Sequence, residues 1–513
     1  MATEGSQTSV PLRTEKRSLL WGMRWIAAAA GFSYVIRLSR GVVLPKLLPP
    51  DSYGLAMSLL LPLTYLRYAD LGVLDQLGKR LPYFRAIEGE EGFRRHFDLG
   101  AAWTLGTAVL SAVGVIVASF WLGGAKAAYY RVGLRLVAAI VVAQRVHFLL
   151  TIMLNAREEF RHSQIGNMLA EGSVFVYCVL GVVWWGPIGM IWAMLFGEIT
   201  VSIYLVTKAH LPRLRYALRP MITMVREGLL LLGVALTELV LQTIDQMFLL
   251  KFFPVAQYGL YVLGTAYLSL FEVSRSLFDA AQPRVMSLTG AGKDVEAKTV
   301  VSTTLVLYGL ILAGAVCGGV LCAAVALRFY LTRYQAGMGL YVLMPIIAIL
   351  RGPAGLLRPF YLSRNWERRL ILYEGAGLLT MVVLDSLAVA LKTGLVGIAV
   401  ATACGWGVSS VLLLRGFEGS VGALIKQFKR YTPYLASTIG VVGLYEFWRV
   451  SSAGAPGSIN IVRLSVAALV YGLGMLVVIY FARAEWLAAL RVVRARPEAQ
   501  EKDIRAILTE VAQ

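Results

Sequence analysis

Charged residues are scarce in this sequence. Asp, Glu, Lys and Arg make up 15% of its 513 residues, whereas a soluble domain carries about 25%. Hydrophobic residues make up 58%, and the mean hydropathy is +0.68. A soluble chain of this composition would expose apolar surface that it cannot cover, and a disordered chain would hold far fewer apolar residues. The composition therefore excludes a cytosolic enzyme and a disordered protein.

Cysteine and catalytic motifs are also scarce. The four cysteines lie inside apolar runs and lack the spacing of metal ligands. The sequence has no Asp-x-Asp, no pair of histidines four residues apart and no Walker-type glycine loop. We therefore expect no disulfide, no metal site and no cofactor, and we predict that the protein is not an enzyme. A membrane glycosyltransferase or polymerase is the enzymatic alternative.

Long apolar runs, in contrast, fill most of the sequence. A helix needs about 20 apolar residues to cross the hydrocarbon core of a bilayer, and about 14 runs are long enough. They lie at about 19–48, 54–75, 99–122, 134–154, 167–185, 188–207, 227–252, 257–280, 300–327, 337–362, 370–391, 394–415, 434–449 and 461–482. We therefore predict an all-α polytopic membrane protein with no separate soluble domain.

The positions of Lys and Arg predict the orientation in the membrane. With the N-terminus inside, the cytoplasmic segments hold most of the basic residues that lie outside the spans. The predicted outer loops hold only Lys126, Arg131, Arg328, Arg333 and Lys392. The positive-inside rule predicts this asymmetry, so we expect both termini in the cytoplasm. The net charge of +19 then reflects topology and attraction to membrane lipids, and we expect no binding to nucleic acid.

Two sequence motifs occur twice. KLLPPDSYGL at 46–55 matches KFFPVAQYGL at 251–260, and GPIGMIWAMLFG at 186–197 matches GLVGIAVATACG at 394–405. The two pairs are offset by roughly 205 and 208 residues, which indicates an internal duplication. The spacing of small residues in the second pair is typical of close contact between helices.

The duplication predicts two lobes of six spans each. Because six is even, both lobes enter the membrane in the same direction, as in transporters that bind substrate between their halves and rock to alternate access. The expected segments are a cytoplasmic N-terminus at 1–18, an N-lobe at 19–226, a C-lobe at 227–433, two further spans within 434–482, and a basic cytoplasmic tail at 483–513.

Several basic residues lie deep within the predicted spans, where an ionisable group usually lines a cavity or is paired. We predict that Arg37, Arg40, Arg145 and Arg351 line a cationic substrate cavity. Arg67 and Asp70, like Glu272 and Arg275, are three residues apart near helix ends, so we expect local ion pairs there. His147 is a lone histidine, for which we favour a buried hydrogen bond over a proton relay.

The duplication pairs charges of opposite sign. At the first offset, Arg40 corresponds to Asp245, and the acidic Glu238 corresponds to Ser33. We hypothesise that Arg40 and Asp245 approach each other near an outer gate. Glu238 and Asp245 are our candidates for binding a coupling cation.

Three further segments resemble a known family. These are the helix of Arg40 followed by LLPxxxYGL at 47–55, LGV at 71–73 leading to KRLP at 79–82, and IDxxxL at 244–249 before YGLY at 258–261. Their order and spacing resemble the polysaccharide and O-antigen flippases of the multidrug/oligosaccharidyl-lipid/polysaccharide exporter superfamily. The resemblance extends over residues 19–482.

The resemblance implies two six-helix lobes and a flippase of the bacterial cytoplasmic membrane. Its substrate would be an undecaprenyl-diphosphate-linked oligosaccharide, carried to the outer leaflet by alternating access. Its partners would include a coupling cation (H⁺ or Na⁺), a polysaccharide polymerase and chain-length machinery. Two alternatives stay open: a cation-coupled multidrug exporter of the same fold, which would need an acidic cavity, and a peptidoglycan-precursor flippase.

Overall fold

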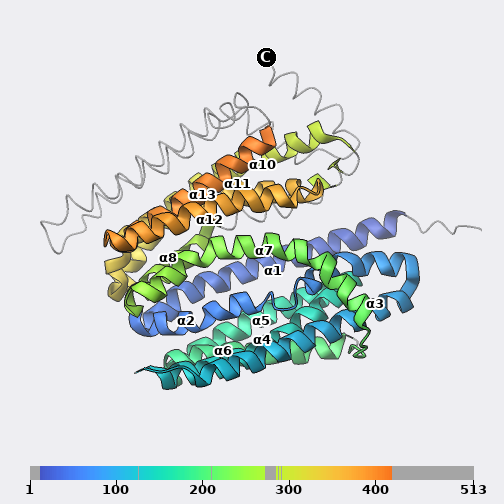
Figure 1. Ribbon diagram of the computed structural model, residues 1–513, viewed down its shortest axis with the longest axis horizontal. Helices are drawn as coiled ribbons and strands as arrows, with labels where there is room; N and C mark the ends of the chain where they lie inside the picture. Colours follow the sequence, from blue (N-terminus) through green and yellow to red (C-terminus); the bar gives the residue numbers. More distant parts are fainter. Residues whose placement is uncertain are drawn as a thin grey trace, which may run out of the picture. The chain divides into compact units, whose positions relative to one another are not determined.

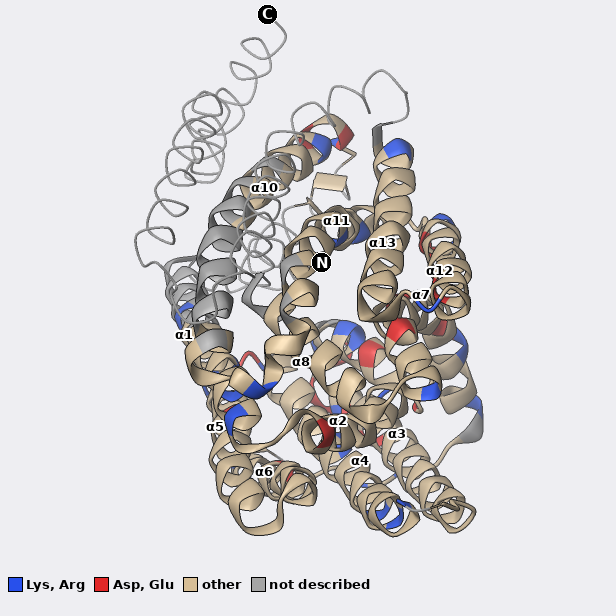
Figure 2. Ribbon diagram, turned by 90° about the vertical axis from the view of Figure 1, so that its left-hand side faces the viewer, with Lys and Arg blue, Asp and Glu red and all other residues tan. Residues whose placement is uncertain are grey.

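The computed structural model describes residues 12–124, 126–209, 211–271, 285–286, 288–289 and 292–418. Every regular element in these residues is a helix (Figure 1), which confirms the predicted all-α fold class. Most of the ribbon carries no charged residue (Figure 2). The predicted spans at 434–449 and 461–482, and the tail at 483–513, lie outside the described residues.

Each of the first twelve predicted spans overlaps one α-helix, although α2 ends at Leu66, well before the predicted end at 75. The α-helices of the described residues are α1 (Leu12–Leu47), α2 (Pro50–Leu66), α3 (Val73–Phe120), α4 (Ala127–Ala156), α5 (Phe160–Trp185), α6 (Pro187–Lys208), α7 (Leu218–Phe252), α8 (Val255–Phe271), α10 (Asp294–Val325), α11 (Met338–Ser363), α12 (Glu367–Ala390) and α13 (Gly394–Glu418). Within the described residues, 7 segments are long and apolar enough to cross a membrane, in α3 to α6 and α11 to α13. The protein is therefore a multi-pass membrane protein.

Helix α3 consists of two parts joined by a bend at Gly89. The backbone there has φ 69° and ψ −161°, a conformation that glycine adopts without strain. Before the bend, buried Leu77 and Leu81 alternate with exposed Lys79 and Arg80. The apolar part that can cross the membrane runs from Ile87 to Phe120. Lys79 and Arg80 therefore lie on the exposed face of an amphipathic segment.

The described residues form two compact units. Unit 1 contains the residues up to Leu47 together with Ser58–Leu232, and unit 2 contains Leu48–Met57 together with the residues from Gly233 onward. In unit 1, α3 packs on α4, α4 and α5 pack on α6, and α1 packs on α5 (Figure 1). In unit 2, α13 packs on both α11 and α12. The division lies close to the expected lobe boundary at 226–227, but it runs within α2 and α7.

Glycines allow two of these helix pairs to approach closely. A Cβ atom on Gly189 of α6 would lie 1.9 Å from the carbonyl oxygen of Gly181 in α5. A Cβ atom on Gly405 of α13 would lie 2.9 Å from the carbonyl oxygen of Gly377 in α12. Gly189 and Gly405 belong to the repeated small-residue motif, so the close packing predicted for it is confirmed in both units.

The other repeated motif brings equivalent residues together within unit 2. A Cβ atom on Gly54 of α2 would lie 2.3 Å from the carbonyl oxygen of Val255, and one on Gly259 of α8 would lie 2.1 Å from that of Pro50. The Tyr334 hydroxyl donates to the Leu48 carbonyl oxygen at 2.9 Å. Gly54 and Gly259 occupy the same motif position and contact each other's helix in the same way, as a two-fold relation between the motifs requires.

Candidate functional site

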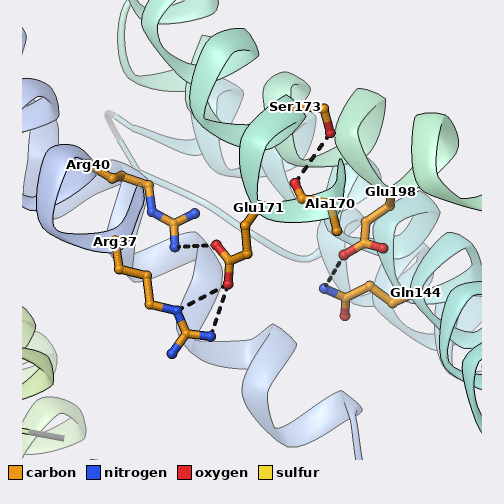
Figure 3. A network of polar contacts seen from close by, with 7 residues as sticks. All are labelled: Arg37, Arg40, Gln144, Ala170, Glu171, Ser173 and Glu198. Atoms are coloured by element: carbon orange, nitrogen blue, oxygen red, sulfur yellow. Dashed lines mark hydrogen bonds and ion pairs between the residues drawn. The ribbon is translucent and has the colours of Figure 1, made fainter. Parts of the chain in front are cut away.

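Arg37 and Arg40, two of the predicted cavity residues, lie on one face of α1 and share one carboxylate of α5 (Figure 3). Arg37 donates through Nε and Nη2 to Glu171 Oε1 at 3.1 and 2.9 Å. Arg40 donates through Nη2 to Glu171 Oε2 at 3.3 Å. The side chains of Arg37, Arg40 and Glu171 are 50%, 29% and 19% exposed. The cluster carries a net positive charge and keeps part of both arginine side chains accessible.

Arg145, another predicted cavity residue, is packed inside unit 1. Its Nη1 lies 3.4 Å from Asp70 Oδ1, and its Nη2 donates to the Leu66 carbonyl oxygen at 2.8 Å and to that of Arg67. The side chains of Arg145 and Asp70 are 2% and 3% exposed. The last carbonyls of a helix have no partner within the helix, so these contacts fix the end of α2.

The expected ion pair between Arg67 and Asp70 is wrong. Helix α2 ends at Leu66 and a run of turns follows, so the two side chains do not share a helical face. Asp70 pairs with Arg145 and also accepts a hydrogen bond from the Leu74 amide at 2.7 Å. The guanidinium of Arg67 instead lies over the Phe148 ring at 5.2 Å. Glu272 and Arg275 lie outside the described residues.

His147 of α4 forms the buried hydrogen bond that the sequence favoured. Its Nδ1 lies 2.9 Å from Glu198 Oε2 of α6, and Gln144 donates to Glu198 Oε1 at 3.2 Å. Figure 3 shows Gln144 and Glu198 beside the arginine cluster but in separate contacts. Unit 1 therefore holds a second polar group, with one carboxylate and no arginine.

Glu238, a predicted coupling residue, forms an ion pair with Arg358 of α11. Arg358 also contacts Glu374 Oε1 of α12 at 2.5 Å. The side chain of Glu374 is 0% exposed and that of Arg358 is 16% exposed. One arginine is thus shared by two carboxylates, whereas at Glu171 one carboxylate is shared by two arginines. The sequence analysis did not predict an arginine beside Glu238.

Asp245, the other predicted coupling residue, is buried within unit 2. It accepts hydrogen bonds from the Tyr261 hydroxyl and from the Thr402 hydroxyl, the latter at 3.1 Å. Asp385 of α12 is fully buried and close enough to repel Asp245. Within the described residues, neither carboxylate oxygen of Asp385 has a hydrogen-bond partner.

These groups fit a hard cation. Carboxylate and hydroxyl oxygens are the donors that such cations prefer, and a positive ion between the two aspartates would offset their repulsion. No group of three or more His, Cys, Asp and Glu residues suited to a metal occurs in the part of the chain that the structure describes. The donor set here is therefore two carboxylates and hydroxyl groups.

The hypothesised approach of Arg40 to Asp245 would join the two units, and it stays a prediction. Arg40 contacts Glu171 in unit 1, whereas Asp245 is hydrogen-bonded inside unit 2. Arg351, the last predicted cavity residue, lies in α11 with its guanidinium 5.3 Å from the centre of the Trp406 ring. The predicted cationic residues thus occur in three distinct surroundings.

Four acidic residues of these sites were missed in the sequence. Glu171, Glu198, Glu374 and Asp385 all lie within predicted spans or beside them. A search of the spans for every ionisable residue, and not only for basic ones, would have found them. The partners of Glu171 and Glu198 could not be found in that way, because those contacts join residues that are far apart in the sequence.

Comparison with known proteins gives matches in structure only. No protein-family model matches the sequence, and no curated protein matches it. The lipid II flippase MurJ in an inward closed conformation matches with a TM-score of 0.67 and 12% identity, over 89% of this chain and 98% of that chain.

Multidrug resistance MATE family transporters of the MOP superfamily match as well. The inward-facing conformation gives a TM-score of 0.62 and 13% identity, over 77% of this chain and 95% of that chain. The outward-facing conformation gives a TM-score of 0.59 and 12% identity, over 82% of this chain and 96% of that chain. At these identities the matches concern the fold, and the chain has the fold of these membrane transporters.

Proposed function

We propose that the protein is a flippase that moves an undecaprenyl-diphosphate-linked oligosaccharide from the cytoplasmic to the outer leaflet of a bacterial inner membrane. The oligosaccharide would be an O-antigen or exopolysaccharide repeat unit. Both termini lie in the cytoplasm, and the substrate is moved without chemical change. A polysaccharide polymerase and its chain-length machinery would take up the product on the outer side.

The observation that carries this proposal is the arginine pair of α1. Arg37 and Arg40 lie in α1, at the first predicted span, remain 50% and 29% exposed, and have one carboxylate between them. Guanidinium groups bind phosphate through paired N–H donors. Charges at membrane depth usually mark a substrate path. A diphosphate group is the part of a lipid-linked sugar that such a pair recognises.

The acidic residues of unit 2 support coupling to a cation. Asp245 and Asp385 are two buried carboxylates of unit 2, and two hydroxyl groups donate to Asp245. Binding of H⁺ or Na⁺ there would lower the cost of burying two like charges. Since a ligand shifts a conformational equilibrium by its difference in affinity for the two states, release of the cation in one state would drive alternating access.

A reconstitution experiment tests the proposal. The purified protein is placed in vesicles with a labelled undecaprenyl-diphosphate-linked oligosaccharide, and the label reaching the opposite leaflet is measured. Arg40→Ala and Arg37→Ala should each lower the rate. Arg135→Ala is the matched control, because Arg135 lies over the Phe120 ring and away from Glu171. Transport by wild type that is equal to that of empty vesicles would refute the proposal.

A second candidate is a cation-coupled multidrug exporter. The buried carboxylates Asp245, Asp385 and Glu374 favour it, because an acidic site suits cationic drugs. The same vesicles distinguish the two functions. Uptake of a cationic dye that depends on Asp385 and not on Arg40 would favour the exporter.

A further inference from the structure

Glu171 occupies the positions that a substrate anion would take on the two arginines. Its Oε1 accepts from Arg37 and its Oε2 accepts from Arg40. Each carboxylate oxygen is thus bound to a different guanidinium group, which is how two phosphate oxygens bind a pair of arginines. In the absence of substrate, the protein supplies its own anion to this site.

The contacts leave part of the site available. A guanidinium group has five N–H donors. Glu171 accepts from two nitrogen atoms of Arg37 and from one of Arg40. The carboxylate is also more covered than the arginines, at 19% exposed against 50% and 29%. An arriving anion therefore meets the guanidinium groups first and competes with the carboxylate for them.

The competition has a consequence for selectivity. Most phospholipids present one phosphodiester with a single negative charge, and they far outnumber a lipid-linked sugar. A prenyl diphosphate sugar presents two negative charges on adjacent phosphates. A phosphodiester with one negative charge gains little binding free energy when it replaces a carboxylate of the same charge. A diphosphate gains a second charge-assisted hydrogen bond.

We infer that Glu171 is a specificity-determining residue of this site, a competing carboxylate that yields to a diphosphate lipid and not to a lipid with one phosphodiester. This inference rests on the proposed function and names what keeps the arginine pair free of bulk lipid. Without Glu171 the two arginines would carry two uncompensated charges, and the nearest phosphodiester would bind there.

The test measures binding selectivity in purified full-length protein. Binding of fluorescent undecaprenyl diphosphate is measured in nanodiscs with increasing phosphatidylglycerol. For wild type we expect weak competition by phosphatidylglycerol. For Glu171→Gln, which keeps the shape and removes the charge, we expect competition at about tenfold lower phosphatidylglycerol. Glu171→Asp keeps the charge on a shorter side chain and should lie between the two, so it serves if the Gln variant does not fold.

Glu198→Gln is the matched control, since Glu198 lies on the next helix and contacts His147 and Gln144 (Figure 3). Its selectivity should equal that of wild type. Unchanged selectivity in both Glu171 variants, or weaker binding of undecaprenyl diphosphate to them with no gain for phosphatidylglycerol, would overturn the inference while leaving the flippase proposal in place. Failure of the wild type to bind undecaprenyl diphosphate would instead refute the proposed function.

Discussion

The cluster around Glu171 in unit 1 and the cluster around Arg358 in unit 2 have opposite ratios of arginine to carboxylate. In unit 1, two arginines share Glu171, and the cluster is open. In unit 2, two carboxylates share Arg358, and Glu374 is fully buried. Asp245 and Asp385 are two further buried carboxylates there. Under the proposed function, the cluster around Glu171 would offer N–H donors to an anion, and the carboxylates of unit 2 would offer oxygen atoms to a cation.

The repeated motifs show what changed between the two repeats and what did not. Gly54 and Gly259 occupy equivalent positions, are both glycine and pack against each other's helix. Arg40 and Asp245 are also equivalent but have opposite charge. A position at a close helix contact has room for glycine only. The charge of a polar residue, in contrast, can be reversed if its partner on another helix changes as well. At these positions the two repeats therefore differ in a charged residue and share the packing glycine.

The largest expected effect is on stability in unit 2. Arg358→Met would leave buried Glu374 and Glu238 without their cation, which should lower the free energy of unfolding by about 3–5 kcal/mol. Arg37→Met in unit 1 removes a half-exposed ion pair and should cost less than about 1 kcal/mol. Denaturant unfolding in detergent measures both variants. If both variants lose the same free energy of unfolding, then the Arg37 and Arg358 clusters do not differ in burial as described.

The sequence was sufficient for the helices and for the repeat. A run of about 20 apolar residues predicts a helix that crosses a bilayer. KLLPPDSYGL and KFFPVAQYGL contain enough identical residues to align the two repeats. The depth of Arg37 and Arg40 also identified them as candidates. These inferences depend on sequence pattern alone, and each of the first twelve predicted spans overlaps a helix of the structure.

The ion partners could not be obtained in the same way. Arg145 was expected beside a cavity, but it lies against Asp70 and the end of α2. Glu238 was paired in the sequence with Asp245 as a coupling residue, whereas it contacts Arg358, more than a hundred residues away. Burial and rotation of each helix about its axis decide such contacts, and one sequence does not determine that rotation.

The next largest effect concerns the glycines that did not diverge. A larger side chain at Gly54 or Gly259 would meet a backbone carbonyl oxygen of the facing helix. Gly54→Leu and Gly259→Leu should each lower the free energy of unfolding by about 1–3 kcal/mol. Gly106→Leu on α3 is the control, because a Cβ there meets nothing within 4 Å. If one of the two repeat-related variants behaves like the control, the contact is not symmetric.

A smaller effect is expected on coupling in unit 2. Asp385→Asn removes one of two charges that would bind a cation, so the Na⁺ or H⁺ concentration for half-maximal transport should rise about tenfold. In Na⁺-free buffer the same variant should unfold at a higher temperature than wild type, because the repulsion between the carboxylates of Asp385 and Asp245 is removed. Glu171→Gln in unit 1 should leave the cation dependence unchanged. If both variants change the cation dependence, then the anion and the cation are not bound by separate units.

The smallest effect should follow from Arg351→Lys, and it tests whether unit 2 contributes to anion binding. Arg351 lies over the Trp406 ring, and a cation over an aromatic ring contributes about 0.5–1 kcal/mol at exposed sites. Lysine keeps the charge, so transport of the lipid-linked oligosaccharide should fall about twofold. Arg40→Lys should cost more, because a lysine lacks the paired donors that bind two oxygens. If Arg351→Lys reduces transport as strongly as Arg40→Lys, then both units bind the anion and the assignment of anion and cation to separate units is wrong.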